Sequence, residues 1–233
     1  MADSRGWVPV ALSSAIEAAT SAGAVIDGAE VVVWRDNKGA AHVWEDRCPH
    51  RGMRMSFGFV RGDHIACLYH GWQYDTGGQC QYIPAHPGLD VPKTIKIPTY
   101  AVEERLGVIW TCLAEDADAG QLPVVEGAFS PIRSLYVDCP AADLAKRLSD
   151  AVLPGSDMPA SLEILTDTAV LLTGGDLRLL VAVQSIAPDR SGLHLVALGA
   201  TELTTVDRKL LAKWAGMLRL SLEAPAPLAT EAA

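Results

Sequence analysis

Two short segments of the sequence combine side chains that bind metals. One residue separates Cys48 from His50, and two residues separate Cys67 from His70. Cysteine thiolate and histidine imidazole are the usual protein ligands of zinc and of iron–sulfur centres. Sixteen residues lie between His50 and Cys67, so each segment offers one sulfur and one nitrogen. If the segments form two facing loops, their four side chains can hold a metal centre.

The order of these ligands separates two metal chemistries. Structural zinc sites usually pair cysteine with cysteine as C-x2–4-C and histidine with histidine as H-x3–5-H, whereas each pair here is mixed. A Rieske [2Fe–2S] cluster takes two cysteines on one iron and two histidines on the other. The pattern favours this cluster, with Cys48 and Cys67 on one iron and His50 and His70 on the other. Zinc stays open as the less favoured alternative, and so does a Cys48–Cys67 disulfide, which nothing in the sequence favours.

The predicted ligand set implies electron transfer at a raised potential. Imidazole in place of thiolate lowers the negative charge on the cluster, and Rieske centres reach roughly −150 to +300 mV, against about −400 mV for plant-type clusters. Gly52 and Gly71 directly follow the two metal-binding segments. We expect them to bring backbone N–H groups close to the cluster sulfurs.

The first half of the chain resembles the Rieske domain of ring-hydroxylating and demethylating non-haem iron oxygenases. The resemblance covers residues 5 to 115, about half the chain, and implies that Trp72 packs beside the second loop as a lid. It implies the same ligand roles for Cys48, His50, Cys67 and His70. The matching segments are Trp7–Val10, Val33–Asp36, Asp46–Gly52, Cys67–Asp75, Ile83–Pro84 and Glu104–Trp110.

Two positions indicate the branch of Rieske proteins that the chain resembles. Respiratory-chain Rieske loops resemble C-T-H-x-G-C and C-x-C-H, and an extra disulfide ties them together. Met53 and Tyr69 occupy those extra positions here, so no such disulfide can form. The resemblance therefore implies the lower-potential oxygenase branch, whose electrons come from a reductase or a ferredoxin.

Composition excludes several other function classes. The 233 residues include 19 Lys+Arg and 28 Asp+Glu, giving a net charge of −9, which argues against a nucleic-acid partner. No apolar run approaches the ~20 residues of a membrane helix, and no signal-peptide pattern is present. We expect a cytoplasmic protein without a membrane partner. Three further cysteines, Cys80, Cys112 and Cys139, are expected to be reduced core residues.

Hydrophobic periodicity and turn residues predict an α+β protein. Residues 1–120 read as short strands joined by turns, which predicts an antiparallel β domain with both metal-binding segments at strand ends. One early helix is expected over Ser13–Ala22. Residues 115–120 are small and acidic and suit a linker.

Residues 130–225 are predicted to form a smaller domain that resembles a shortened helix-grip domain. A helix is expected over Pro140–Leu153, followed by four strands and a final helix over Val206–Glu223. The apolar stripe of the final helix is predicted to face the core, and residues 226–233 are predicted to be a disordered tail. The stripe consists of Leu210, Leu211, Trp214, Leu218 and Leu222.

Histidine usage argues against a second iron site in this chain. Oxygenase α subunits resembling the first half carry a mononuclear iron bound by two histidines and one carboxylate. Only His194 lies beyond residue 115, in an alternating strand that predicts a half-exposed position. We therefore predict no catalytic residues, and an electron-transfer subunit whose partner chain carries the iron, in an oligomer that resembles trimeric oxygenases. The alternatives are a free-standing electron carrier and a non-redox protein that uses the metal to stabilise its fold.

Overall fold

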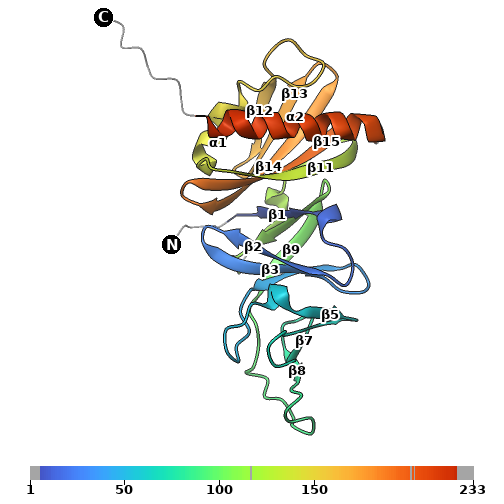
Figure 1. Cartoon of the computed structure of the whole chain (residues 1–233), viewed down its shortest axis with the longest axis vertical. Coiled ribbons are helices and arrows are strands. Elements are labelled where there is room, and N and C mark those ends of the chain that lie inside the picture. Colours follow the sequence, from blue (N-terminus) through green and yellow to red (C-terminus); the bar gives the residue numbers. More distant parts are fainter. Residues whose placement is uncertain (1–5, 116, 200, 202, 225–233) are drawn as a thin grey trace, which may run out of the picture.

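The computed structural model describes residues 6–115, 117–199, 201 and 203–224. Three antiparallel sheets follow one another along the long axis of the molecule (Figure 1). A five-stranded C-terminal sheet with a long helix lies at one end, a six-stranded sheet lies in the middle, and a small four-stranded sheet lies at the other end.

Both N-terminal sheets consist of short strands joined by tight turns. The six-stranded sheet has the order β1-β10-β9-β4-β3-β2, and the small sheet has the order β5-β6-β7-β8. The chain forms the small sheet between β4 and β9, so the small sheet is an insertion between two neighbouring strands of the six-stranded sheet. The bounds are β1 Val8–Leu12, β2 Ser21–Ile26, β3 Ala29–Arg35, β4 Ala41–Glu45, β5 Phe59–Arg61, β6 His64–Ala66, β7 Gln73–Asp75, β8 Cys80–Tyr82, β9 Thr99–Arg105 and β10 Val108–Cys112.

The C-terminal sheet has the order β11-β15-β14-β13-β12, and two helices cover one of its faces. Helix α2 begins after Thr204, whose hydroxyl accepts a hydrogen bond from the amide of Asp207 at 3.2 Å, which is an ordinary N-cap. The bounds are β11 Ala128–Val137, α1 Ala141–Leu148, β12 Ser161–Thr166, β13 Ala169–Gly174, β14 Leu177–Ala187, β15 Arg190–Gly199 and α2 Thr205–Glu223.

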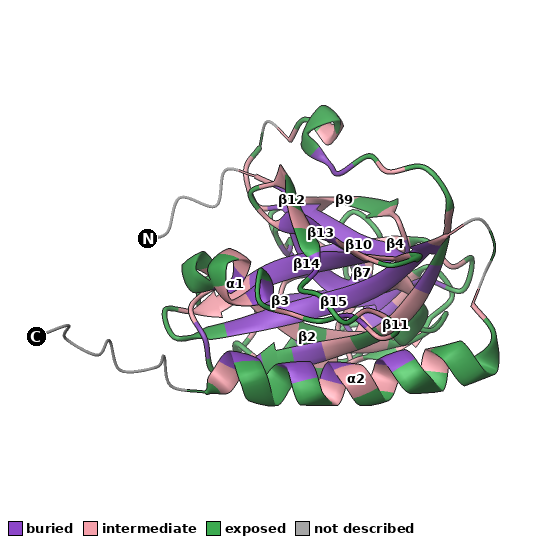
Figure 2. Cartoon of the chain, turned by 90° about the horizontal axis from the view of Figure 1, so that it is seen from above, coloured by how far each residue is buried: buried purple, intermediate pink, exposed green. Residues whose placement is uncertain are grey.

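The central strands of the C-terminal sheet are apolar on both faces, because both faces are covered. Side chains alternate along a strand, so Leu179 and Val181 of β14 pack against the helices. Leu180 and Ala182 point the other way and pack with Trp7 and Trp110 of the six-stranded sheet. Figure 2 shows β14 and β15 buried, while α2 exposes its outer side. The near-continuous hydrophobic run of β14 follows from this double burial.

The β2–β3 hairpin joins the six-stranded sheet to the C-terminal sheet. Its two-residue turn places Asp27 and Gly28 at φ values of 47° and 84°, as a type I′ turn requires. The amides of this turn donate to the carbonyls of Ser185 and Ile186 in β14, both at 2.9 Å. The hairpin tip therefore continues the hydrogen bonding of β14.

The predicted α+β class is confirmed, and two helix predictions need correction. The helix expected over Ser13–Ala22 is wrong: only Ser13–Ala15 forms a single 3-10 turn, and strand β2 starts at Ser21. Backbone pairing of β2 with β3 outweighs the helix propensity of the alanines there. The helix expected over Pro140–Leu153 ends at Leu148. The predicted domain limits stay a prediction, and the predicted tail over residues 226–233 lies outside the described residues.

Candidate metal centre

The two metal-binding segments form loops with the same hydrogen bonding. The amide of Cys48 donates to the carbonyl of Met53 at 2.8 Å, and the amide of Gly52 donates back to the carbonyl of Cys48 at 2.8 Å. In the second loop, the Cys67 amide donates to Trp72 at 2.9 Å and the Gly71 amide donates to Cys67 at 2.9 Å. Each loop therefore holds its cysteine at the same place within a closed turn.

A left-handed glycine closes each loop. Gly52 has a φ of +70° and Gly71 a φ of +69°, a region that side chains other than glycine enter at a cost. A Cβ on Gly71 would also lie 3.1 Å from Cγ of Pro84, whereas a Cβ on Gly52 would meet nothing within 4 Å. The glycines expected from the sequence are therefore required by backbone conformation.

The two cysteine thiols lie side by side in the interior. Cys48 is 2% exposed and Cys67 is 3% exposed. A hydrogen bond from the Cys67 thiol lowers the pKa of Cys48 to about 6, and the same bond raises the pKa of Cys67. A buried thiolate next to a second buried sulfur suits metal ligation, because the thiolate is the ligating form.

Tyr74 adds a hydrogen bond to this pair from strand β7. Its hydroxyl lies 3.2 Å from Sγ of Cys48. Burial, and then the bond to Cys48, raises the pKa of Tyr74, so the phenol keeps its proton and donates to the sulfur. Tyr74 is absent from the site residues predicted from the sequence; it is buried in strand β7 in the same hydrophobic cluster as Cys48 and Cys67.

The two histidines lie nearer the surface and face each other. The ring centroids of His50 and His70 are 4.6 Å apart. Trp72 stacks on His50 at 4.3 Å with a 5° interplanar angle, so the expected lid covers the histidine of the first loop. Desolvation, followed by electrostatic interaction with the neighbouring His50 ring and the Arg51 guanidinium, lowers the pKa of His70. This direction favours the neutral imidazole, which is the ligating form.

Two acidic side chains, Asp46 and Glu30, bind residues that flank the first loop. The carboxylate of Asp46 accepts hydrogen bonds from the amide and the hydroxyl of Ser56, both at 2.7 Å. Glu30 of β3 forms ion pairs with Arg47 and Arg54, which flank the loop. These contacts place the first loop relative to the six-stranded sheet, and no local sequence signal predicts them.

This arrangement fits a two-iron centre better than a single ion. Within residues 6–224, apart from those not described, no three His, Cys, Asp or Glu side chains converge on one point where an ion could bind. The cysteines instead form an inner pair and the histidines an outer pair. A tetrahedral zinc site needs four ligands around one ion, whereas a Rieske cluster takes one pair for each iron. All five cysteines are unpaired, which also disfavours the disulfide alternative.

Comparison with known proteins agrees with the ligand pattern. The sequence profile of the Rieske [2Fe-2S] domain matches residues 6–101. This part of the chain is a Rieske [2Fe–2S] domain. The Rieske domain carries a [2Fe–2S] cluster, so the predicted cofactor is confirmed. The assignment of Cys48, His50, Cys67 and His70 as its individual ligands stays a prediction.

The Rieske domain has relatives among oxidoreductases and demethylases. It is similar to the oxidoreductase NdmD of Pseudomonas putida, with 38% identity over 114 residues, covering 48% of this chain and 19% of that protein. Methylxanthine N1-demethylase NdmA of the same organism is 40% identical over 95 residues, covering 41% of this chain and 27% of that protein. The matched segments thus span less than a third of either relative.

The fold likeness extends beyond the Rieske domain. The solved structure of a Pseudomonas putida CBB5 NdmA mutant with theobromine superposes with a TM-score of 0.78 at 19% identity, covering 99% of this chain and 85% of that one. The predicted resemblance to Rieske non-haem iron oxygenases is thereby confirmed at the level of fold. None of the helices that the structure describes is long and apolar enough to cross a membrane.

His194 occupies a different position from the one predicted. It is 0% exposed, not half-exposed, because its strand face lies against the Rieske domain. Its Nδ1 accepts from the hydroxyl of Ser134 at 2.8 Å, and its Nε2 lies 2.9 Å from Oε1 of Gln184. Both ring nitrogens are therefore engaged in hydrogen bonds.

Proposed function

We propose that this chain is the Rieske electron-transfer subunit of a multi-component non-haem iron oxygenase. It receives electrons from a reductase or a ferredoxin and relays them to a mononuclear iron on a partner chain. The observation that carries the proposal is the pair of facing loops with Cys48 and Cys67 inside and His50 and His70 outside. The cluster supplies reversible one-electron chemistry when it is bound.

The cysteine side of the site is buried, whereas the histidine side is exposed to solvent. When the cluster is bound, the buried Cys48 and Cys67 would hold one iron and the more exposed His50 and His70 would hold the other. Tyr69, 54% exposed, packs against His70 at a centroid distance of 3.9 Å. The histidine side is therefore the side that a partner protein can approach, and we assign both electron entry and electron exit to it.

The C-terminal sheet supports a role in assembly instead of catalysis. A facial triad needs two histidines, and His194 is the only histidine after residue 115. Because Ser134 and Gln184 already occupy both its nitrogens, His194 is a poor candidate ligand. We assign residues 1–120 to the Rieske domain and residues 130–225 to a reduced oxygenase-like domain that forms an interface.

The proposed assembly places the acceptor iron on another chain. The small sheet, whose core includes Cys48 and Cys67, lies at the opposite end of the molecule from the C-terminal sheet (Figure 1). An electron leaving at the histidine side therefore moves away from the C-terminal sheet of its own chain. A trimer-based hetero-oligomer in the cytoplasm, where five unpaired cysteines stay reduced, would bring a partner's iron to this end.

A free-standing Rieske-type electron carrier is the second candidate. The exposure of Leu68 and Tyr69 beside His70 favours it, because such a surface suits brief contacts with several partners. A carrier has no need of the ordered C-terminal sheet, so we rank this function below the subunit function.

The deciding experiment is anaerobic co-expression with a candidate chain that carries a facial triad. We expect a stable mixed oligomer, two irons per Rieske chain, a Rieske EPR signal and oxygenase activity that needs both chains. The variant His70→Ala should lose the EPR signal, while His86→Ala, at an exposed position outside both loops, should keep it. Oxygenase activity from this chain alone would contradict the proposal. Fast reduction and reoxidation without any stable complex would favour the carrier.

A further inference from the structure

Helix α2 is apolar on two of its sides. One set of apolar side chains is buried against the C-terminal sheet and consists of Leu211, Ala215, Leu218 and Leu222. A second set is between 55% and 75% exposed and consists of Val206, Leu210, Met217 and Leu220. A helix on the surface of a domain needs only one apolar side, and the sheet accounts for the first set. The second set therefore indicates a further contact.

The exposed set follows the spacing of a helix that pairs with another helix. Starting at Val206, steps of four, three, four and three residues lead to Leu210, Lys213, Met217 and Leu220. This alternation is the heptad pattern of paired helices, and it places all five side chains along one side of α2. We call these five residues the outer stripe. Lys213 is its polar member.

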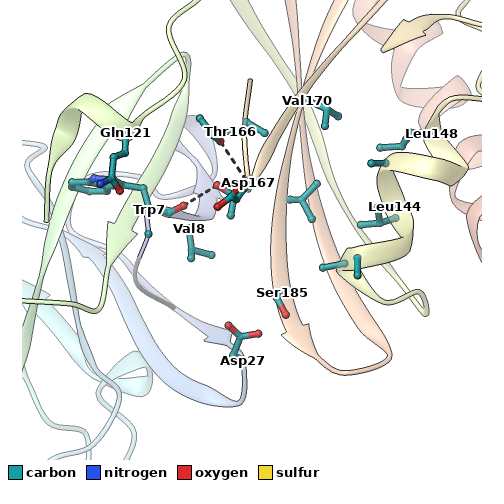
Figure 3. Close-up of a pocket in the computed structure, with 17 residues that line it drawn as sticks. Trp7, Val8, Asp27, Gln121, Leu144, Leu148, Thr166, Asp167, Val170 and Ser185 are labelled. Carbon is teal, nitrogen blue, oxygen red and sulfur yellow. Dashed lines mark hydrogen bonds between the residues drawn. The ribbon is translucent and has the colours of Figure 1, made fainter. Parts of the chain in front are cut away.

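None of the described residues covers the outer stripe. Helix α1 faces the Rieske domain of its own chain across a cavity, with Trp7 and Asp27 on one side and Leu144 and Leu148 on the other (Figure 3). Helix α2 instead exposes its outer side to solvent (Figure 2). Exposed apolar patches of this kind mark protein interfaces, so the outer stripe suits a second protein chain.

The outer stripe is complementary to itself when two copies of α2 run antiparallel. A two-fold axis at the level of residue 215 places Leu210 of one copy opposite Leu220 of the other, and Lys213 opposite Met217. Leucine therefore packs on leucine at both ends of the pair. The aliphatic stem of Lys213 covers Met217, and its ammonium group reaches water.

Charges favour this antiparallel pairing over a parallel one. A parallel pair would set each Lys213 directly opposite the same lysine of the other copy, and like charges repel. The antiparallel pair offsets the two lysines along the helices. The heptad positions beside the stripe then bring Lys209 of one copy opposite Glu223 of the other. Two such pairs form around the axis, and each joins opposite charges.

Gly216 is the second observation that points to a close neighbour. Glycine weakens a helix interior relative to alanine, and Gly216 lies in the interior of α2. A Cβ at this position would meet nothing within 4 Å, so the fold of the chain itself does not require glycine here. In the antiparallel pair, Gly216 lies beside Gly216 of the other copy at the axis, where two missing side chains let the helices approach.

We propose that two copies of this chain associate through their α2 helices, which pair antiparallel along the outer stripe. The pair is closed by its two-fold axis, so this surface joins two copies and no more. Helix α2 lies at the end of the molecule opposite the small sheet (Figure 1). The pairing therefore leaves His50 and His70 open to other proteins, and it neither needs nor prevents the proposed electron transfer.

The test is sedimentation equilibrium of the full chain, with its cluster loaded, from about 1 to 100 µM. We expect a reversible dimer with twice the 24.8 kDa mass of one chain. Leu210→Glu should weaken the dimer at least about tenfold, because it buries a carboxylate against Leu220 of the other copy. Ile164→Glu is the control, since it makes the same change in charge at an exposed position of β12 and should leave the dimer intact.

A mixing experiment determines the orientation of the helices. Leu220→Lys alone should also weaken the dimer at least about tenfold. Mixing Leu210→Glu chains with Leu220→Lys chains should restore a dimer, because the antiparallel pair sets the new carboxylate opposite the new ammonium group. In a parallel pair, each new charge would face an unchanged leucine and no dimer would return. Thermal unfolding checks that each variant is folded.

A chain that stays monomeric over the whole concentration range would overturn the proposal, even if the outer stripe then bound an oxygenase chain. Equal weakening by Ile164→Glu and Leu210→Glu would also overturn it, as would a mixture that fails to restore the dimer. The measured mass depends neither on an electron donor nor on an acceptor iron. A failed oxygenase reconstitution together with an intact dimer would reject the proposed function and leave this pairing standing.

Discussion

The Nε2–H group of His194 donates to the amide oxygen of Gln184 at 2.9 Å, inside a fully buried contact. Ser134 donates to the other ring nitrogen at 2.8 Å, which fixes this tautomer. The side-chain amide of Gln184 in turn donates to the carbonyl of Val25 in the Rieske domain at 2.9 Å. A chain of three hydrogen bonds therefore runs from β11 through β15 and β14 into β2.

The free energy of unfolding should fall at acidic pH because His194 is buried in its neutral form. Burial lowers the pKa of His194 to about 4, whereas the ring has a pKa of about 6.5 in the unfolded chain. The unfolded state therefore binds a proton first as pH falls, and stability that is complete above about pH 6.5 is lost down to about pH 4. The loss should be about 2.5 kcal/mol between pH 7 and pH 4.5, measured by urea unfolding at these two pH values.

A matched variant separates this effect from general acid unfolding. His194→Gln is expected to be less stable than the native chain at pH 7, and the gap should narrow steadily as pH falls to 4.5. A gap that stays constant over this interval would show that His194 does not titrate in the way its burial requires.

Replacing Gln184 should lower the free energy of unfolding substantially. Gln184→Leu leaves the His194 N–H without an acceptor and the Val25 carbonyl without a donor, and unsatisfied buried groups cost about 1–3 kcal/mol each. We expect a loss of about 2–4 kcal/mol in the free energy of unfolding. Gln81→Leu is the control, because Gln81 is exposed and donates to Asp75 at the surface. Equal losses for the two variants would contradict a special role for the buried bond.

Tyr74→Phe should lower the reduction potential of the Rieske centre. A hydrogen bond to a ligand sulfur stabilises the more negative, reduced state, and Tyr74 is placed to donate to Cys48. Losing a bond worth about 1 kcal/mol should lower the potential by about 40–60 mV. Potentiometric titration followed by EPR measures the shift. The control is Tyr100→Phe in β9, which should leave the potential in place; a similar fall in both variants would contradict this assignment.

The loop glycines should respond to alanine in a defined order. Gly52→Ala places a side chain at a φ of +70° in open space, so it should cost about 1–2 kcal/mol from backbone conformation alone. Gly71→Ala adds a contact of 3.1 Å with Pro84 and should cost more, with lower iron content. Gly88→Ala, which meets nothing within 4 Å and has no left-handed φ, should be nearly neutral. Thermal unfolding and iron per chain give the order, and a tolerant Gly71→Ala would contradict it.

The sequence predicts the features that arise from local chemistry. The four proposed ligands and the left-handed glycines are carried by short motifs, so the facing loops can be expected from the sequence alone. The β3–β4 and β5–β6 hairpins follow from turn residues at positions 36–39 and 62–63. In each case the information lies within a few residues of the feature.

Features that depend on distant contacts could not be predicted. The alternation around His194 indicates one solvated strand face, but the Rieske domain covers that face. The apolar stripe of α2 predicts a buried Leu210, yet Leu210 is exposed and Ala215 is buried in its place with Leu211, Leu218 and Leu222. Which side of a helix or strand meets water depends on the packing of the whole chain, and a local pattern does not contain it.

The β2–β3 hairpin connects the C-terminal sheet to the first ligand loop and not to the second. At its tip, the amides of Asp27 and Gly28 are fastened to β14. Two residues further on, Glu30 holds Arg47 and Arg54 on either side of the first ligand loop. Residues 27–30 of this one hairpin therefore contact both β14 and the arginines beside the Cys48–His50 loop. The Cys67–His70 loop instead lies between strands β6 and β7 of the small sheet.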